Sequence, residues 1–273
     1  MTGVENAYDG CRAHYSYLAG DITKSYDDVT VDGVERRMLA VYTTDETAPA
    51  IFFVYDNIAS KGADFKKSFL LHTVKEPKVS TNELGQLTAT VVEGNGKLVL
   101  TNVHGGNNIY AIGGEGYAYW IGNNEEYDGT EKSGKNLVDK NLKDDEYHTI
   151  WGRVEITARG ERVSKLLNTM IITDADKECV AASVKVETDT VVGATVNNIT
   201  AIFVKNSERT GEAVSFTTVG DGAMKYYVSG VAAGEWEIYS GDNKVGTASA
   251  TEAGGFLCFE ATAGDVTLKP IKA

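Results

Sequence analysis

The stretch IFFVYDNIASKGADFKKSFLLHTVKEP, residues 51–77, contains two apolar runs rich in β-branched and aromatic residues, separated by a polar segment with a glycine. Runs of this composition on either side of a polar turn predict a pair of β-strands. Because side chains alternate along a strand, His72 is expected on the same face as Leu70 and on the opposite face from Phe69. A histidine at the end of a strand either packs against the core or reaches a ligand.

Length and composition extend this prediction to the whole chain. The 273 residues, of which 42% are hydrophobic, are enough to bury the core of one large or two ordinary domains. Glycine (29 residues) far outnumbers proline (3), and tyrosine is frequent (14), which favours short strands joined by glycine turns. We therefore expect an all-β protein, with a large antiparallel β-sandwich followed by a smaller antiparallel β-sheet domain.

Strand-like segments occur on both sides of a polar break. Before it lie residues 34–43, 51–58, 66–74, 87–93, 97–103, 117–121, 150–158 and 166–173, and after it lie 224–229, 235–240, 244–250, 256–261 and 265–270. The break is TDADKE, residues 173–178, so we place the sandwich in residues 1–176 and the small β-domain in residues 177–273. Glycine turns between the last five segments predict a β-meander.

The net charge of −13 and the pI of about 4.8 argue against partners that bind proteins through basic surfaces. We expect no nucleic-acid partner and no membrane partner, because both attract proteins through positive charge. Three cysteines, Cys11, Cys179 and Cys258, are an odd number spread far apart, which fits neither a CxxC metal site nor a disulfide framework. No cofactor and no metal-binding residue is expected in this chain, and no apolar run has the length of a membrane span.

Five blocks carry a family resemblance. They are YSYLAGDITKSY (15–26), the stretch 51–77, IGGEGYAYW (112–120), WGRVEI (151–156) and LLNTMIITD (166–174). In this order and spacing they resemble the β-sheet region of the heparinase II/III-like polysaccharide lyases. The resemblance covers roughly residues 12–176 and continues more weakly to the end of the chain.

The resemblance implies a longer parent enzyme. Lyases of this family combine an N-terminal (α/α) toroid, which carries the tyrosine and histidine of the elimination chemistry, with a β-sandwich and a small β-domain. Neither the toroid nor the family's His-x-His-x-Asp, Asp-Pro-Gly and His-Asn-Thr segments occur in this sequence. We therefore expect the β-domain portion of a lyase that cleaves uronic-acid-containing polysaccharides by β-elimination. On its own this portion would be inactive, so we assign it no catalytic residue.

The same resemblance sets the expected surroundings of the chain. The partners would be the missing toroid and, through the parent enzyme, an acidic polysaccharide or oligosaccharide. A divalent metal would belong to the parent, whose location would be periplasmic or secreted in a bacterium. A free-standing carbohydrate-binding or adhesive β-module, without catalysis, is the alternative hypothesis.

Few residues qualify as site candidates. Of the four histidines, His14, His72, His104 and His148, His72 lies in a block that carries the resemblance, and His104, before two glycines, is expected in a loop. Two tyrosines, Tyr117 and Tyr119, could stack on sugar rings, whereas Trp120 points to the opposite face and is expected in the core. We take His72, Tyr117 and Tyr119 as substrate-binding candidates, although a structural role is the more common one for such residues. At spacing two, Arg153 and Glu155 predict an ion pair within a sheet.

Overall fold

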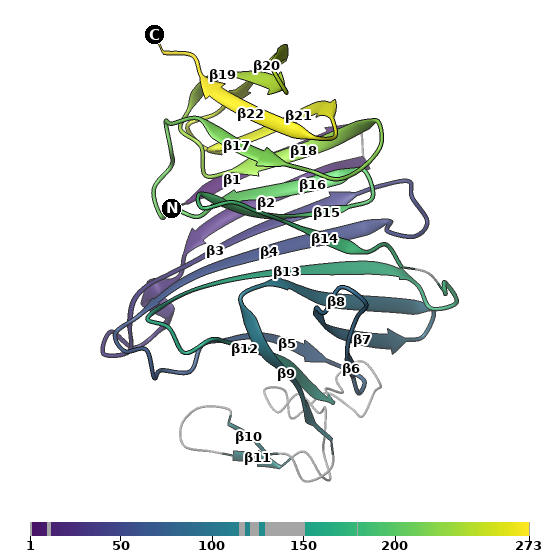
Figure 1. Ribbon diagram of the computed structural model, residues 1–273. Coiled ribbons are helices and arrows are strands. Elements are labelled where there is room, and N and C mark those ends of the chain that lie inside the picture. Colours follow the sequence, from purple (N-terminus) through teal and green to yellow (C-terminus); the bar gives the residue numbers. More distant parts are fainter. Residues whose placement is uncertain are drawn as a thin grey trace.

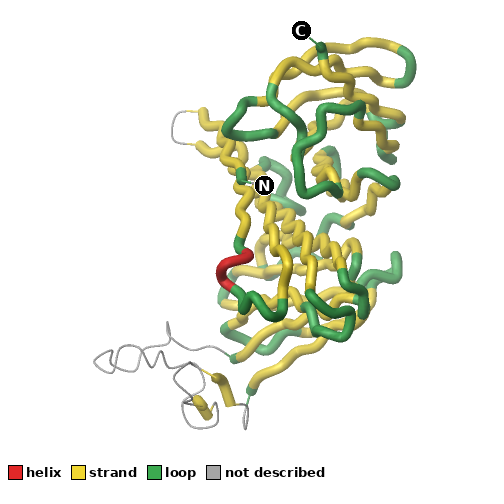
Figure 2. The backbone as a smooth tube through the Cα atoms, turned by 90° about the vertical axis from the view of Figure 1, so that its left-hand side faces the viewer, coloured by secondary structure: helices red, strands yellow, loops and turns green. Residues whose placement is uncertain are grey.

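The computed structural model describes residues 2–9, 12–114, 118–120, 126–128, 151–178 and 180–272. The prediction of an all-β protein is confirmed: strands form five sheets, and the described residues contain a single helical turn, the 3₁₀ segment η1 (Thr23–Ser25), drawn red in Figure 2. Four of the sheets lie one above another as layers, with the three-stranded sheet at the bottom and the four-stranded sheet at the top of Figure 1.

The largest layer is an eight-stranded antiparallel sheet in the order β1-β2-β3-β4-β13-β8-β7-β6. Its strands are β1 (Gly3–Asp9), β2 (Arg12–Asp21), β3 (Val31–Tyr42), β4 (Ala50–Ser60), β6 (Lys78–Thr81), β7 (Leu87–Glu93), β8 (Gly96–His104) and β13 (Val163–Asp174). Six of the segments predicted from the sequence are strands of this sheet or of its three-stranded neighbour with shifted ends, and β7 has the predicted bounds.

A three-stranded sheet covers one face of this layer. It contains β5 (Ser68–Thr73), β12 (Gly152–Ala158) and β9 (Gly106–Gly113) in the order β5-β12-β9. The prediction that residues 51–77 form a strand pair is wrong, because β4 pairs with β3 and β13 whereas β5 pairs with β12. The connection between β4 and β5 spans residues 61–67, which is longer than most hairpin loops and lets the chain cross from one layer to the next.

The chain after β13 builds two further sheets. A five-stranded sheet contains β14 (Ser183–Glu187), β15 (Val191–Val196), β16 (Ile199–Val204), β18 (Ala223–Ser229) and β21 (Phe256–Thr262); a four-stranded sheet contains β17 (Val214–Thr217), β22 (Asp265–Pro270), β19 (Gly234–Ser240) and β20 (Asn243–Ala250). The predicted meander is wrong, because the last five strands are divided between the two sheets, and only β19 and β20 pair as neighbours in sequence. Only β16 and β18 pair in parallel among the described strands, since β17, which joins them, lies in the other sheet. A two-stranded ribbon of β10 (Ala118–Trp120) and β11 (Glu126–Asp128) lies apart.

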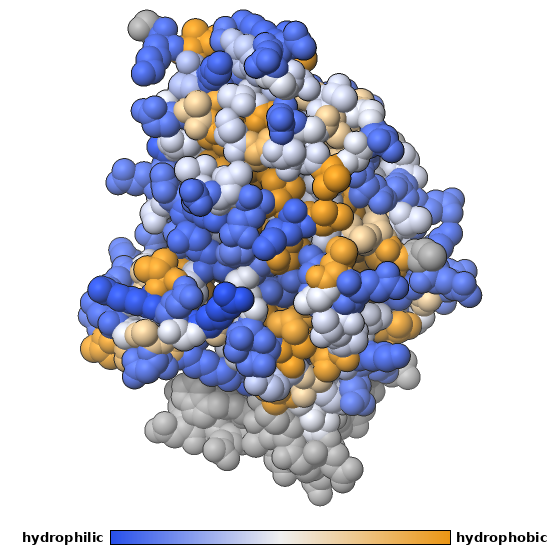
Figure 3. Space-filling model, viewed as in Figure 1, coloured by the Kyte–Doolittle hydropathy of each residue, from blue (hydrophilic) through white to orange (hydrophobic). Residues whose placement is uncertain are grey.

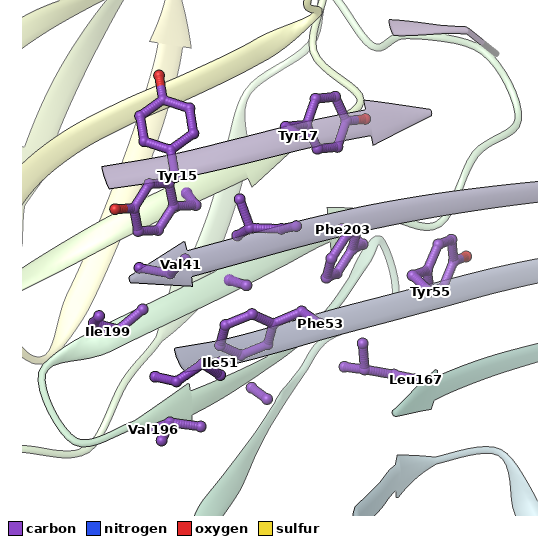
Figure 4. Close-up of a cluster of buried hydrophobic side chains, with 14 of the residues drawn as sticks. Tyr15, Tyr17, Val41, Ile51, Phe53, Tyr55, Leu167, Val196, Ile199 and Phe203 are labelled. Atoms are coloured by element: carbon purple, nitrogen blue, oxygen red, sulfur yellow. The ribbon is translucent and has the colours of Figure 1, made fainter. Parts of the chain in front are cut away.

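Three apolar clusters hold the four layers together. The first lies between the three-stranded and eight-stranded sheets and includes Val54 and Phe69. The second lies between the eight-stranded and five-stranded sheets and contains Tyr17, Phe53 and Phe203 (Figure 4). The third fills the space between the five-stranded and four-stranded sheets around Trp236 and Leu268, which are 1% and 0% exposed. On the face viewed in Figure 3, hydrophilic side chains predominate and apolar ones show mainly along the middle.

Stacking explains why some strands are apolar throughout. In β4, Phe53 and Tyr55 face the five-stranded sheet while Val54 between them faces the three-stranded sheet, so both faces of the strand are buried. All six residues of β15 and all six of β16 are buried for the same reason. Strands covered on both faces are expected to be continuously apolar instead of alternating.

Arg37 links the large sheet to the C-terminal sheets. Its guanidinium is fully buried, pairs with Glu35 at 3.0 Å, and donates hydrogen bonds to the carbonyl oxygens of Val204 (2.8 Å) and Asn206 (2.7 Å). Tyr55 stacks beneath it, with its ring centre 5.4 Å from the guanidinium carbon. Residues 1–176 and 177–273 therefore share a core and a buried polar contact, and the boundary between them stays a prediction from the sequence.

Candidate functional site

Of the three substrate-binding candidates named from the sequence, the structure describes the side chain of one. Of these, His72 lies on edge strand β5 beside Arg153 of β12, and its side chain is exposed on the outer face of the three-stranded sheet. His72 therefore does not pack in the core of the described structure, and its role as a structural or cleft-wall residue of the parent enzyme stays a prediction. Tyr117 and His148 lie outside the described residues, and for Tyr119 and Trp120 only the backbone, in β10, is described.

The predicted ion pair in β12 is confirmed. The Glu155 carboxylate is 2% exposed, lies 3.3 Å from the Arg153 guanidinium, and also contacts the Lys66 ammonium. The Ser68 hydroxyl donates a hydrogen bond of 3.1 Å to it. Burial by itself would raise the pKa of Glu155, but the contacts with Lys66 and Ser68 outweigh this effect and lower the pKa. This cluster is a structural contact on the outer sheet.

A cavity surrounds another histidine, His104. Its volume is about 680 Å³, and it lies at the edge of the stack, where β8, β13 and β14 meet the turn between β6 and β7. Its lining is mostly polar or charged: Leu84, Gly85, Gln86, Leu87, Asn102, Val103, His104, Gly105, Gly106, Arg159, Glu161, Val163, Ser164, Lys165, Val184, Lys185 and Glu187.

Two glycines position His104 at the end of β8. The prediction of a loop at this point is wrong, because Gly106 already begins β9 and leaves only Gly105 between the two strands. With φ at +84°, Gly105 adopts a conformation that other residues rarely take, and a Cβ atom there would collide with the carbonyl oxygen of Lys165. The Asn102 side chain spans this sharp turn, since it accepts a hydrogen bond from the Gly106 backbone nitrogen (2.9 Å) and donates one to the His104 carbonyl oxygen (3.1 Å).

Across the cavity, His104 meets a carboxylate from the C-terminal part of the chain. Its Nδ1 lies 3.3 Å from Glu187 Oε2, while Lys185 and Lys205 contact the same carboxylate at 2.9 and 3.0 Å. Burial lowers the pKa of His104 below its ordinary 6.5, and the charge of Glu187 opposes only part of this shift. Burial alone would raise the pKa of Glu187, but hydrogen bonds from Lys185 and Lys205 outweigh it and lower the pKa to about 2.

This cluster suits anion binding better than metal binding or proton transfer. Glu187 is the only carboxylate in contact with His104 among the described residues, and two ammonium groups already neutralise it. The described residues contain no group of three or more histidine, cysteine, aspartate or glutamate side chains placed to hold a metal ion. Nor do they include a helix with the length and apolar composition of a membrane span.

The architecture is that of a multilayered β-protein with a polar cavity at the edge of its stack of sheets. Residues 185–270 match the protein family described as Heparinase II C-terminal domain. The C-terminal part of the chain, from the end of β14 through β22, is therefore a heparinase II C-terminal domain, a β-domain related to polysaccharide lyases. No curated protein compared with the chain matches it.

The matched residues fall where the sequence resemblance was weaker. None of the five blocks between residues 12 and 176 lies inside the match, so their likeness to the β-sandwich of the family stays a prediction. The cavity lies between the two regions, because His104 and Lys165 come from the large sheet whereas Lys185 and Glu187 come from the matched domain.

Proposed function

We propose that this chain is the β-domain portion of a polysaccharide lyase that acts on uronic-acid-containing polysaccharides by β-elimination. In this role it supports a catalytic (α/α) toroid and lines part of the substrate cleft. The observation that carries the proposal is the heparinase II C-terminal domain at residues 185–270, which shares a continuous buried core with the large sheet.

The chemistry of the His104 cavity supports a non-catalytic role for the chain alone. Elimination at a uronic acid requires a group that neutralises the carboxylate, a base for the C5 proton and an acid for the leaving oxygen. A carboxylate with a pKa of about 2, such as Glu187, is a weak base at neutral pH. His104 faces that carboxylate and not a second proton-transfer group, so the acid and base belong to the toroid in this proposal.

The proposal is tested on the full product of the gene and on the isolated 273-residue chain. Unsaturated uronate absorbs ultraviolet light, so elimination is followed directly with heparin-type and alginate-type polymers as substrates. We expect turnover by a full product that contains a helical toroid, and none by the isolated chain or by a product that lacks it. Turnover by the isolated chain would refute the division of labour.

The same experiment decides against the alternative hypothesis. If the full gene product has no toroid and no elimination activity, yet retains uronate polymers on an affinity column, the chain is a carbohydrate-binding or adhesive module. Far-UV circular dichroism of the full product shows whether the helical domain is present.

A further inference from the structure

A second cavity adjoins the one beside His104, and we call the two together the groove. The second cavity has a volume of about 590 Å³ and shares two lining residues with the first, Val163 and Lys165 of β13. Lys205, whose ammonium group bonds to Glu187 at 3.0 Å, lines this second cavity. The groove therefore runs along the edge of the stack, with Lys165 at the junction of its two halves.

The two halves differ in charge. In the first half, Arg159, Lys165 and Lys185 outnumber the acidic Glu161 and Glu187, although the whole chain carries a net charge of −13. The lysines of the second half are balanced by Asp21 and Glu208, since its remaining acid, Glu35, is paired with Arg37. Asparagine, serine and threonine side chains add neutral hydrogen-bonding groups to this half.

Among the described residues, Lys165 and Arg159 are the cations of this groove without a fixed counter-ion, and Lys165 is the one that lines both halves. Its neighbours Lys185 and Lys205 both bond to Glu187, whereas no hydrogen bond or ion pair joins the Lys165 ammonium to any described residue. Burial, and then the positive charge of Lys205, lower the pKa of Lys165. An anion placed here would relieve both effects, because it would supply the missing opposite charge.

We propose that this groove binds an oligosaccharide of uronic acids, with Lys165 contacting a carboxylate of the ligand and the second half contacting hydroxyl groups of the adjoining sugar. A uronate chain carries both kinds of group side by side, which matches a cationic half next to a neutral polar half. A small inorganic anion would use only the first half, and a neutral oligosaccharide would leave Lys165 without an opposite charge. The inference rests on the proposed function and specifies where the β-domain contacts the substrate.

Titration calorimetry on the 273-residue chain tests the proposal. The probes are an unsulfated oligouronate, a neutral oligoglucoside of the same length, and sodium sulfate. We expect the oligouronate to bind and the neutral oligomer to bind much more weakly. A hydrogen bond to a charged group contributes about 1.5–3 kcal/mol, so Lys165→Gln should weaken oligouronate binding by about tenfold or more.

Matched variants separate the groove from general charge effects. Lys272→Gln removes the same charge from an exposed residue near the C-terminus, beyond the four-stranded sheet (Figure 1), and should leave binding unchanged. Lys165→Arg should retain most of the affinity. The proposal would be overturned if wild type and Lys165→Gln bound the oligouronate with equal affinity, or if no binding were detected. It would also be overturned if the neutral oligomer or sulfate bound as tightly as the oligouronate. Absence of elimination by the full gene product would instead refute the proposed function and leave a binding result intact.

Discussion

Replacing Arg37 with methionine should destabilise the protein by about 3–5 kcal/mol, which is the usual cost of breaking a buried ion pair by removing one partner. The guanidinium is fully buried, and it donates hydrogen bonds of 2.8 and 2.7 Å to the carbonyl oxygens of Val204 and Asn206, which the substitution would remove. Glu35, 6% exposed, would also lose its partner at 3.0 Å. A loss of this size is a large part of the 5–15 kcal/mol that stabilises a typical domain.

Urea unfolding followed by circular dichroism measures this effect. We expect one cooperative transition in both proteins, with a lower midpoint and a similar slope for Arg37→Met, because Arg37 links the large sheet to the end of β16. The control is Arg162→Met, since the Arg162 guanidinium is 65% exposed where it bonds to Asp32, and such a pair contributes about 1 kcal/mol or less. A loss below about 1 kcal/mol for Arg37→Met, or two separate transitions in the wild type, would refute the reasoning that the layers form one unit.

Three further predictions concern the histidines and the groove. In thermal melts, Gly105→Ala should destabilise the protein by more than the roughly 1–2 kcal/mol that a left-handed conformation costs, because the new Cβ meets the Lys165 carbonyl. The control is Gly94→Ala, at φ +55° with open space around it, which should incur only the conformational cost. The low pKa of Glu187, about 2, stabilises the fold above its ordinary pKa of 4.5, and this contribution is lost as the pH falls toward 2. Because the carboxylate is 29% exposed, Glu187→Gln should flatten the acid limb of the stability curve by only about 1 kcal/mol, and an unchanged limb would contradict the assignment. His72→Ala, at an exposed position, should change the free energy of unfolding by less than about 0.5 kcal/mol in urea titrations, and a loss of several times that would show a buried role.

Much of the fold was predictable because alternation is a local signal. The segments around β7, β19 and β22 alternate between polar and apolar residues, and their predicted positions agree with the structure to within one residue. By contrast, β15 and β16 were not predicted as strands, because both are buried on two faces and have no period-two pattern. The pairing of strands was harder to predict than their positions. Although β4 and β5 follow one another in sequence, they lie in different layers, and their arrangement depends on long-range packing such as that of Val54 against Phe69.

The groove could not be found from the sequence for a related reason. His104 and Glu187 are separated by 83 positions and meet only because β14 of the C-terminal part lies against β8. The one local signal was the pair of glycines after His104, which suggested a loop but in fact mark a sharp turn between β8 and β9. His72, which the sequence placed in a stretch resembling the lyases, is on the outer sheet, and its role in substrate binding stays a prediction.

The most direct test of the account is the steady-state kinetics of the full gene product with and without Lys165→Gln, measured by the ultraviolet absorbance of unsaturated uronate. If the β-domain lines the substrate cleft through the groove, the substitution removes binding energy that substrate and transition state share equally. We therefore predict that KM rises about tenfold while kcat stays unchanged. Identical kinetics for the two proteins would contradict the claim that this domain contacts the substrate there.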